Sequence, residues 1–273
     1  MGPIGKLAAP IVAGSLCLLC SPAPGRTQAH SLHQQSAAAI LESRFNDPDT
    51  SYLLLDHEGR VIAQKWDGKE QEVAIGSLIK PFVAAAYAQT HRTYPAFRCL
   101  GGKTCWLPRG HGRMGIREAI AQSCNSYFRQ LAGNSKPNFF ASLLNDYGLN
   151  PHTDGQQGEA APLALARAYL RFGQRRNEPA LAPIFDGMAE SAVNGTAKAA
   201  GKAFGSGRED MLAKTGTAPC THARKAPGDG FTVLLYPAER PQMLLLVRVH
   251  GHPGAIAAAT AGQMLSAVSK GPE

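Results

Sequence analysis

The segment Gly76-Ser77-Leu78-Ile79-Lys80-Pro81-Phe82 (GSLIKPF) places a serine and a lysine three residues apart, where an alanine-rich helical pattern begins and runs to about Thr90. Residues three apart lie on the same face of a helix, so the Ser77 hydroxyl and the Lys80 amine are expected to be neighbours. A serine becomes a good nucleophile when an adjacent base takes its proton, and a lysine serves as that base when burial lowers its pKa. The pair therefore indicates a nucleophile and its base, although this spacing also occurs often by chance.

Two later motifs carry compatible chemistry. Ser123-Cys124-Asn125 lies between two helical patterns, and its serine can relay a proton while its carboxamide donates and accepts hydrogen bonds. Lys214-Thr215-Gly216-Thr217 lies on an extended segment, where the glycine lets a ligand approach the backbone and the other side chains can hold a carboxylate. Taken singly, the first motif is also an ordinary helix cap and the second an ordinary edge strand.

Apolar runs of strand length lie near both ends of the chain. They cover residues 51–56 and 61–66, which predict a hairpin, and residues 211–218, 231–236 and 243–249. Helical patterns cover residues 36–45, 117–122, 127–132, 138–147, 162–171 and 255–269. This order predicts an α+β fold: one antiparallel sheet built from N- and C-terminal strands, flanked by helices, with an inserted helical lobe at about residues 83–200.

The composition is that of an ordinary folded protein. Apolar residues make up 44% and charged residues 18% of the 273 positions, which excludes an intrinsically disordered chain. Lys and Arg exceed Asp and Glu, so the chain carries a net charge of +8. No zinc-finger spacing, recognition-helix signature or aromatic RNA-binding platform is present, so no nucleic-acid partner is expected.

The first 29 residues have the order of a secretory signal peptide. The basic Lys6 precedes an apolar run over residues 7–20, and small and polar residues then end at Ala29, a suitable cleavage position. The run is shorter than the roughly 20 residues that a membrane span needs. We therefore expect a secreted or periplasmic protein after cleavage, with one domain over residues 30–273. A lipid or membrane anchor is not favoured, and a buried N-terminal helix is the alternative interpretation of the leader.

Together, the order and context of the three motifs resemble the penicillin-binding protein transpeptidase family, within the serine D,D-peptidase and β-lactamase superfamily. The likeness extends beyond them. Residues 52–66 resemble the hairpin before the family's nucleophile, residues 111–128 (HGRMGIREAIAQSCNSYF) resemble the stretch around its second motif, and residues 193–197 (VNGTA) resemble the turn before its third. The helical lobe over residues 134–192 matches only loosely.

The resemblance implies a role for each motif residue. Ser77 would attack the D-Ala-D-Ala amide of a peptidoglycan stem peptide, or a β-lactam ring, and become acylated. Lys80 would be its base, and Ser123 would relay a proton to the leaving amine. Asn125 would hold the substrate amide. The third motif would bind the terminal carboxylate through Lys214, Thr215, Gly216 and Thr217, and the N–H groups of Ser77 and Thr217 would form the oxyanion hole.

Three outcomes of such a site remain open at this point. The leading one is an exported D,D-transpeptidase or D,D-carboxypeptidase that binds penicillin. A serine β-lactamase is the second, although no glutamate is clearly arranged as the water-activating base of class A enzymes. The third is a non-catalytic penicillin-recognising sensor or scaffold. None of these requires a cofactor, and we expect no metal, since His222, His250 and His252 lack a metal-binding spacing.

The remaining signals concern cysteines and arginines. An oxidising compartment favours a disulfide between Cys99 and Cys105, with free thiols as the alternative; a second bridge from Cys124 to Cys220 is left open. Arg167, Arg171 and Arg175 recur at four-residue steps. Such a stripe is either a solvated helix face or a surface for anionic envelope polymers.

Overall fold

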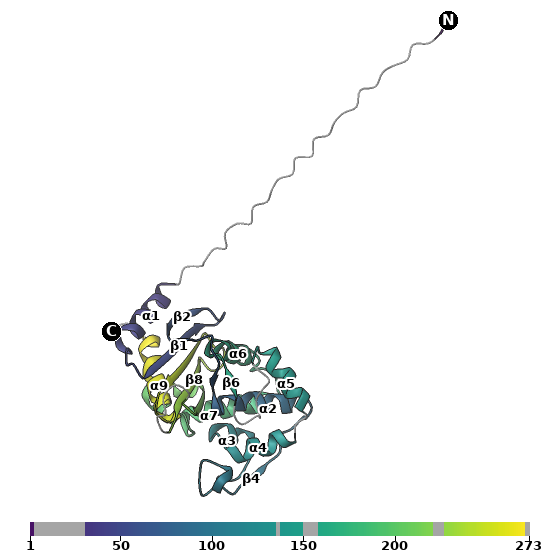
Figure 1. Cartoon of the computed structure of the whole chain (residues 1–273), viewed down its shortest axis with the longest axis vertical. Helices are drawn as coiled ribbons and strands as arrows, with labels where there is room; N and C mark the ends of the chain where they lie inside the picture. The colour runs from purple at the N-terminus through teal and green to yellow at the C-terminus, as the bar shows by residue number, and fades with distance from the viewer. Residues whose placement is uncertain (3–30, 135–136, 150–157, 221–226, 271–273) are drawn as a thin grey trace.

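The computed structural model describes residues 1–2, 31–134, 137–149, 158–220 and 227–270 (Figure 1). The predicted leader, residues 1–29, lies almost wholly outside this part of the chain. At the centre is a five-stranded sheet in the order β2-β1-β9-β8-β7. Its strands are β1 (Thr50–Asp56), β2 (Val61–Lys65), β7 (Leu212–Ala218), β8 (Asp229–Tyr236) and β9 (Met243–Val249).

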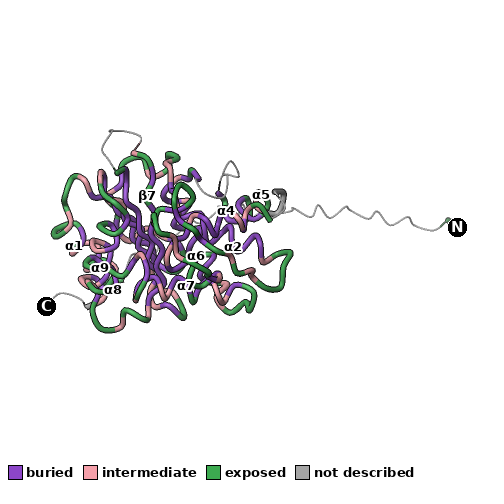
Figure 2. The backbone as a smooth tube through the Cα atoms, turned by 90° about the horizontal axis from the view of Figure 1, so that it is seen from below, coloured by how far each residue is buried: buried purple, intermediate pink, exposed green. Residues whose placement is uncertain are grey.

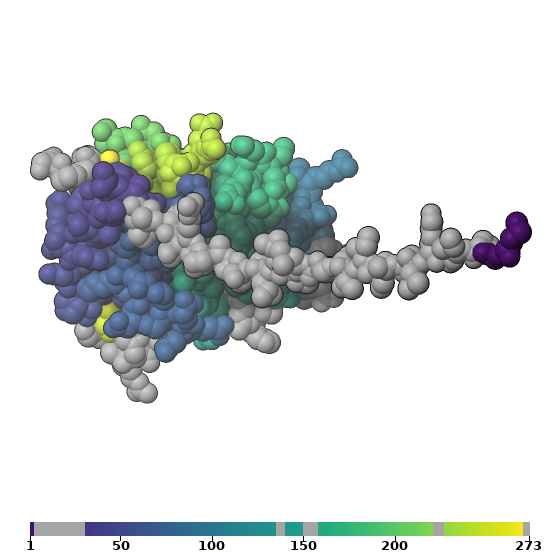
Figure 3. All heavy atoms as spheres, turned by 90° about the horizontal axis from the view of Figure 1, so that it is seen from above, coloured from purple at the N-terminus to yellow at the C-terminus, as the bar shows by residue number. Residues whose placement is uncertain are grey.

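Strand β1 pairs with an N-terminal strand on one side and a C-terminal strand on the other. Its Leu53 pairs with Gln64 of β2 on one side and with Leu246 of β9 on the other, and every neighbouring pair in the sheet is antiparallel. Residues from both ends consequently adjoin on one face of the molecule, purple beside yellow-green (Figure 3). The predicted antiparallel sheet, built from N- and C-terminal strands, is confirmed.

Both faces of the sheet are covered by helices, which explains why the strands have continuous apolar runs. Successive side chains of a strand point to opposite faces. Tyr52 and Leu54 pack with helices α1 (Leu32–Arg44), α8 (Lys198–Phe204) and α9 (Gly254–Lys270). Leu53 and Leu55 instead join the core shared with the helical lobe. Buried residues accordingly run through the middle of the molecule (Figure 2).

The inserted lobe surrounds helix α2 (Lys80–Ala88), which is buried over residues 80–87. A helix that is apolar on all sides belongs in a protein core. Phe82 on α2 is fully buried and meets the rings of Tyr147, Tyr169 and Phe172. The other lobe helices are α3 (Ile116–Ala121), α4 (Asn125–Gly133), α5 (Pro137–Asp146), α6 (Pro162–Gln174) and α7 (Ala182–Val193). No helix among the described residues is both long and apolar enough to span a membrane.

Short elements complete the fold. Strand pairs β3 (Val73–Ala74) with β6 (Glu159–Ala160), and β4 (Phe97–Cys99) with β5 (Gly112–Met114), form two small sheets. The 3₁₀ turns are η1 (Gly76–Ile79), η2 (Gly102–Thr104) and η3 (Arg208–Asp210). Sequence patterns did not predict α7 and α8, and they placed Ser77 in a regular helix, whereas it lies in η1 just before α2.

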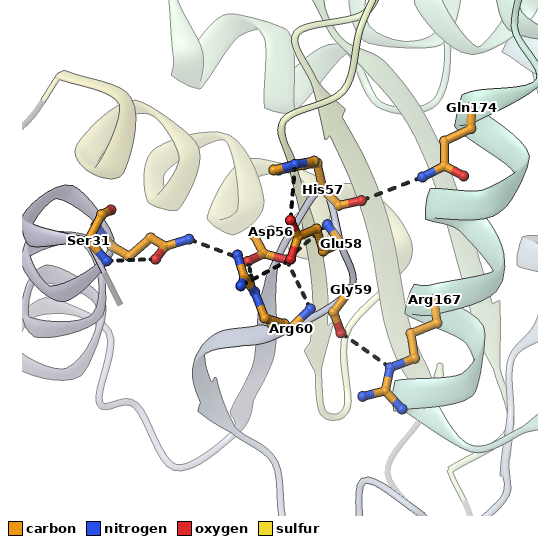
Figure 4. Close-up of polar contacts among 9 residues, drawn as sticks. Ser31, Asp56, His57, Glu58, Gly59, Arg60, Arg167 and Gln174 are labelled. Carbon is orange, nitrogen blue, oxygen red and sulfur yellow. Dashed lines mark hydrogen bonds and ion pairs between the residues drawn. The ribbon is translucent and has the colours of Figure 1, made fainter. Parts of the chain in front are cut away.

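The buried carboxylate of Asp56 anchors the turn between β1 and β2 (Figure 4). It accepts hydrogen bonds from Arg60 Nε at 2.7 Å, from the backbone N–H groups of Glu58 and Arg60, and from Gln34 of helix α1. Burial alone would raise the pKa of Asp56, but the hydrogen bonds from Arg60 and the backbone lower it below its usual 3.8. The charged carboxylate therefore ties the hairpin to α1.

We expect Asp56→Asn to lower the free energy of unfolding by about 1 to 3 kcal/mol at neutral pH, because charge-assisted hydrogen bonds are lost. A lowered carboxyl pKa contributes stability above the unfolded-state pKa, and this contribution disappears as the pH falls through the folded-state value. The difference between wild type and variant, measured by urea denaturation, should shrink below about pH 3.8. A difference that stays constant with pH would contradict this account.

Candidate active site

The Ser77 turn lies against strand β7 because two glycines let the backbones touch. Gly76 has a φ of +52°, and a side chain there would come within 2.4 Å of the Thr217 carbonyl. A side chain on Gly216 would lie 2.9 Å from the carbonyl of Ile75. Neither position has room for a larger residue, so η1 and the third motif are held side by side.

Helix α6 fixes the same turn from the lobe side. The hydroxyl of Tyr169, wholly buried, donates a hydrogen bond to the carbonyl of Leu78, the residue after Ser77. Sequence reasoning missed this residue, since a tyrosine in a helical pattern is usually core packing. Ser77 itself is half-buried, and its hydroxyl has no hydrogen-bond partner among the described residues, so no hydrogen bond joins it to Lys80.

Lys80 reaches the second motif instead. Its buried Nζ donates to Asn125 Oδ1 at 2.5 Å and to the Ser123 carbonyl at 2.8 Å, and lies 3.3 Å from Ser123 Oγ. Burial lowers the pKa of Lys80 from 10.5 to about 7, while the sulfurs of Cys124 and Cys105 act in the opposite direction. An amine with this pKa can take and return a proton near neutral pH.

Lys214 approaches the same hydroxyl from the sheet. Its Nζ donates to Ser123 Oγ at 2.8 Å and to the Thr215 carbonyl at 2.7 Å. Burial, together with the charge of Lys80, holds the pKa of Lys214 well below 10.5. Neither lysine forms an ion pair with a carboxylate in the part of the chain that the structure describes. Two buried amines thus share one hydroxyl without a counter-ion.

Ser123 holds this position at a backbone cost. Its φ is +49°, the left-handed region that residues other than glycine seldom adopt, and it is buried. Such strain costs about 1 to 3 kcal/mol and persists only where the surroundings enforce it. Here Lys80 and Lys214 enforce it through the three hydrogen bonds given above. Strained residues of this kind cluster at functional sites.

The two threonines of the third motif differ in their surroundings. Thr215 is buried, and its hydroxyl donates to Thr196 at 2.7 Å, in the 193–197 stretch singled out from the sequence. Thr217 is exposed, and its hydroxyl oxygen accepts the N–H of Gly254 at 3.0 Å, at the start of α9. Among the described residues the Thr217 hydroxyl hydrogen has no acceptor, whereas that of Thr215 is engaged inside the protein.

Four of the predicted site residues (Lys80, Ser123, Asn125 and Lys214) are thus joined by direct hydrogen bonds. Gly216 and Thr217 contact the turn that carries Ser77, through the residues beside it. The Thr215 side chain is buried and bonded to Thr196 instead.

The cysteines near this site are separate thiols. The disulfide predicted between Cys99 and Cys105 is not formed in the structure. The two sulfurs instead lie near the imidazole of His111, at 3.6 and 3.4 Å from its Nδ1. The alternative of free thiols is the one that the structure contains. Cys220 does not approach Cys124; its sulfur lies 3.5 Å from Nδ1 of His250, which is buried against Asp229 rather than exposed. His222 lies outside the described residues.

Each arginine of the stripe makes a hydrogen bond to a neighbouring part of the fold. Arg167 donates to the carbonyl of Gly59, and Arg171 donates to the carbonyl of Tyr147. Arg175 donates to the Tyr147 hydroxyl and pairs with Glu178. Arg167 and Arg171 are nevertheless exposed and Arg175 is half-buried, so the stripe lies on a solvated face of α6 and at its C-cap.

No model of a protein family matches the sequence, and no curated protein matches it. Solved structures do match. The apo transpeptidase domain of Burkholderia pseudomallei penicillin-binding protein 3 superposes with a TM-score of 0.70 at 17% identity, covering 91% of this chain and 96% of that one. A peptidoglycan glycosyltransferase from Burkholderia ambifaria gives 0.66 at 16% identity, covering 88% and 97%. The D,D-transpeptidase domain of a peptidoglycan glycosyltransferase from Eggerthella lenta gives 0.65 at 15% identity, covering 88% and 82%.

At these identities the likeness establishes the fold. The chain has the transpeptidase fold of penicillin-binding proteins, which confirms the fold expected from its three motifs.

The lowered pKa of Lys80 predicts a pH-dependent stability. The unfolded chain keeps the Lys80 proton up to about pH 10.5, whereas the folded chain keeps it only up to about pH 7. Wild type should therefore gain stability relative to Lys80→Met as the pH rises between these two values. The slope for one proton approaches about 1.4 kcal/mol per pH unit. Urea denaturation of both proteins across this range measures it.

The matched control is Lys198→Met, which removes an exposed lysine on α8. Its stability difference from wild type should not change with pH over the same window. Parallel pH profiles for wild type and Lys80→Met would mean that Lys80 keeps its ordinary pKa in the folded protein.

Proposed function

On the transpeptidase fold of the penicillin-binding proteins, we propose that this chain is a serine D,D-peptidase. It acts on the D-Ala-D-Ala end of peptidoglycan stem peptides through an acyl-enzyme on Ser77, and penicillin acylates the same serine. The observation that carries the proposal is the pair of buried amines, Lys80 and Lys214, around the Ser123 hydroxyl beside the Ser77 turn. A fold alone does not imply an activity, whereas this site supplies a nucleophile, a base and a proton relay.

In the proposed acylation, Ser77 Oγ attacks the carbonyl carbon of the scissile amide, and the neutral Lys80 amine takes the hydroxyl proton. The N–H groups of Ser77 and Thr217 stabilise the negative charge that develops on the carbonyl oxygen. When the carbon–nitrogen bond breaks, the proton passes through Ser123 to the leaving amine. Lys80 is then neutral again, and the acyl group remains on Ser77.

Substrate binding in this proposal uses the uncompensated positive charge of the site. A terminal carboxylate placed near Lys214 supplies the counter-ion that the described residues lack. Thr217 donates its remaining hydroxyl hydrogen to that carboxylate, and Asn125 holds the substrate amide. Thr215, which the sequence also suggested as a carboxylate ligand, acts in this scheme by positioning β7 through Thr196.

The acceptor of the acyl group decides the product. Transfer to an amine gives a transpeptidase, and transfer to water gives a carboxypeptidase. A serine β-lactamase would release the penicillin adduct quickly, and a sensor or scaffold would bind wall peptides without turnover. The predicted leader, with export to the periplasm or outside, belongs to the same proposal, as does attraction of the basic protein to anionic envelope polymers.

A fluorescent penicillin should label the wild-type protein covalently, and Ser77→Ala should abolish labelling because no other hydroxyl replaces the nucleophile. Gel fluorescence and the intact mass of the adduct measure this. The matched control is Ser43→Ala, an exposed serine on α1, which should label like wild type. Equal labelling of Ser77→Ala and wild type would overturn the assignment of the nucleophile.

The lifetime of the adduct separates the enzyme classes. An adduct that persists for hours supports the peptidase, and rapid loss supports a β-lactamase. Release of D-alanine from a synthetic stem peptide then distinguishes a peptidase from a sensor.

The rate of acylation should depend on pH through Lys80. Because the pKa of Lys80 is lowered to about 7, the fraction of its amine that is neutral falls about tenfold for each pH unit below that value. The groups that face this amine are Lys214 on β7, Ser123 just before α4, Asn125 and the Phe128 ring on α4, and the sulfurs of Cys105 and Cys124. Stopped-flow acylation by a chromogenic β-lactam should rise with pH and level off above about 7. A rate independent of pH would exclude Lys80 as the base.

A further inference from the structure

Four side chains capable of binding a metal converge under the second motif. Cys99 ends β4, Cys105 follows η2, His111 precedes β5, and Cys124 is the N-cap residue of α4. Each offers one ligand atom, and these four atoms all lie within 4.8 Å of one another. The three cysteines are buried and His111 is half-buried. This group is called the Cys₃His cluster below.

Three of the six distances between donor atoms match a tetrahedral zinc site, and the other three are within 4.8 Å. With zinc–sulfur bonds of about 2.3 Å and zinc–nitrogen bonds of about 2.0 Å, tetrahedral ligands lie about 3.8 Å apart for two sulfurs and about 3.5 Å apart for sulfur and nitrogen. Cys105 and Cys124 Sγ are 3.9 Å apart, and His111 Nδ1 lies 3.4 Å from Cys105 Sγ and 3.6 Å from Cys99 Sγ. One ion fits between them.

Hydrogen-bond geometry near the cluster suits metal ligands. The backbone N–H of Tyr127 donates to Cys124 Sγ at 3.4 Å. Hydrogen bonds from outside the ligand shell orient metal ligands and support their charge. On His111, Nε2 is buried without a hydrogen-bond partner among the described residues, and Nδ1 faces the sulfurs. The ring can therefore keep its proton on Nε2 and coordinate through Nδ1.

The loop that carries these residues is closed by its own backbone. Gly101 and Gly110 both have positive φ, and a side chain on either would come within 2.4 Å of the opposite backbone. Gly102 N–H donates to the Pro108 carbonyl at 2.9 Å. The tightly folded loop therefore holds Cys99, Cys105 and His111 together, and the fourth donor, Cys124, comes from the start of α4.

A disulfide explains this cluster less completely. A bridge between Cys99 and Cys105 would bring two sulfurs to about 2.05 Å and leave a third buried thiol and an imidazole beside them. A zinc ion uses all four donors at their present spacing. Three thiolates and a neutral imidazole also leave the occupied site with one net negative charge, close to the two buried amines that lack a carboxylate.

We propose that Cys99, Cys105, His111 and Cys124 bind one zinc ion, which fixes the segment Ser123-Cys124-Asn125 from beneath. Binding releases the thiol protons and leaves three zinc–thiolate bonds and one zinc–imidazole bond. Because Cys124 lies between the two residues that contact Lys80, the metal holds the strained backbone of Ser123 in place. The zinc has no open position and takes no part in the chemistry.

The test uses the full chain, purified under reducing conditions and supplied with zinc. We expect about one tightly bound zinc per chain by elemental analysis, lost in Cys105→Ala and retained in Cys220→Ala, the matched cysteine outside the cluster. Cobalt in place of zinc should give the intense red-region absorption of a tetrahedral site with thiolate charge transfer in the near ultraviolet. In Cys105→His, which restores a donor, metal binding should return with about one third less thiolate charge transfer.

Three results would overturn the site, and the first two are cobalt with the weak spectrum of an octahedral ion and zinc lost equally from wild type and Cys105→Ala. A Cys99–Cys105 disulfide in the exported protein, seen as a mass lower by two hydrogens, would do so too. Removal of zinc by a chelator should slow penicillin acylation at least tenfold, reversibly. Zinc bound without any acylation of Ser77 would refute the proposed activity and leave the metal site standing, so the two failures are distinguishable.

Discussion

Two lysine amines are buried around a single serine hydroxyl, and much of the surrounding structure is constrained by their burial. Burying a charged amine without a counter-ion is expensive, and the protein meets that cost by lowering the pKa of both groups and by supplying carbonyl and hydroxyl oxygens. Lys80 comes from the central lobe helix α2, Lys214 from strand β7, and Ser123 from the junction of α3 and α4. The hydroxyl stays between the amines only while lobe and sheet keep their relative positions.

The backbone supplies that rigidity. Gly76 and Gly216 allow the Ser77 turn to lie directly on β7, and Tyr169 ties the same turn to α6. Ser123 adopts a left-handed conformation that its hydrogen bonds maintain. On the proposed function, this arrangement keeps nucleophile, base and relay close together before substrate arrives. On the proposed metal site, the Cys₃His cluster would hold in place the segment Ser123-Cys124-Asn125, which carries the backbone strain at Ser123.

Much of the fold could be predicted because its signals are local. The run of leucines in β1 and the turn after Asp56 indicate a hairpin, and the strands β8 and β9 have equally strong apolar runs. Helix α7 escaped prediction because its polar and small residues weaken the pattern, although it packs on α3. The cysteine and histidine cluster was missed because its spacing, Cys-x5-Cys-x5-His-x12-Cys, matches no common zinc motif. It is apparent only when the loop is folded.

By itself, the sequence determined the strands of the central sheet, most of the helices and the residue types of the three motifs, because periodicity and glycine placement act over a few residues. Only the tertiary structure decided how those motifs meet. Ser123 lies 43 residues from Lys80 and 91 from Lys214, yet its hydroxyl contacts both amines. The lowered pKa of Lys80, the inward engagement of Thr215 and the outward exposure of Thr217 follow from burial. Burial is a property of the whole packed chain, and no local pattern of residues encodes it.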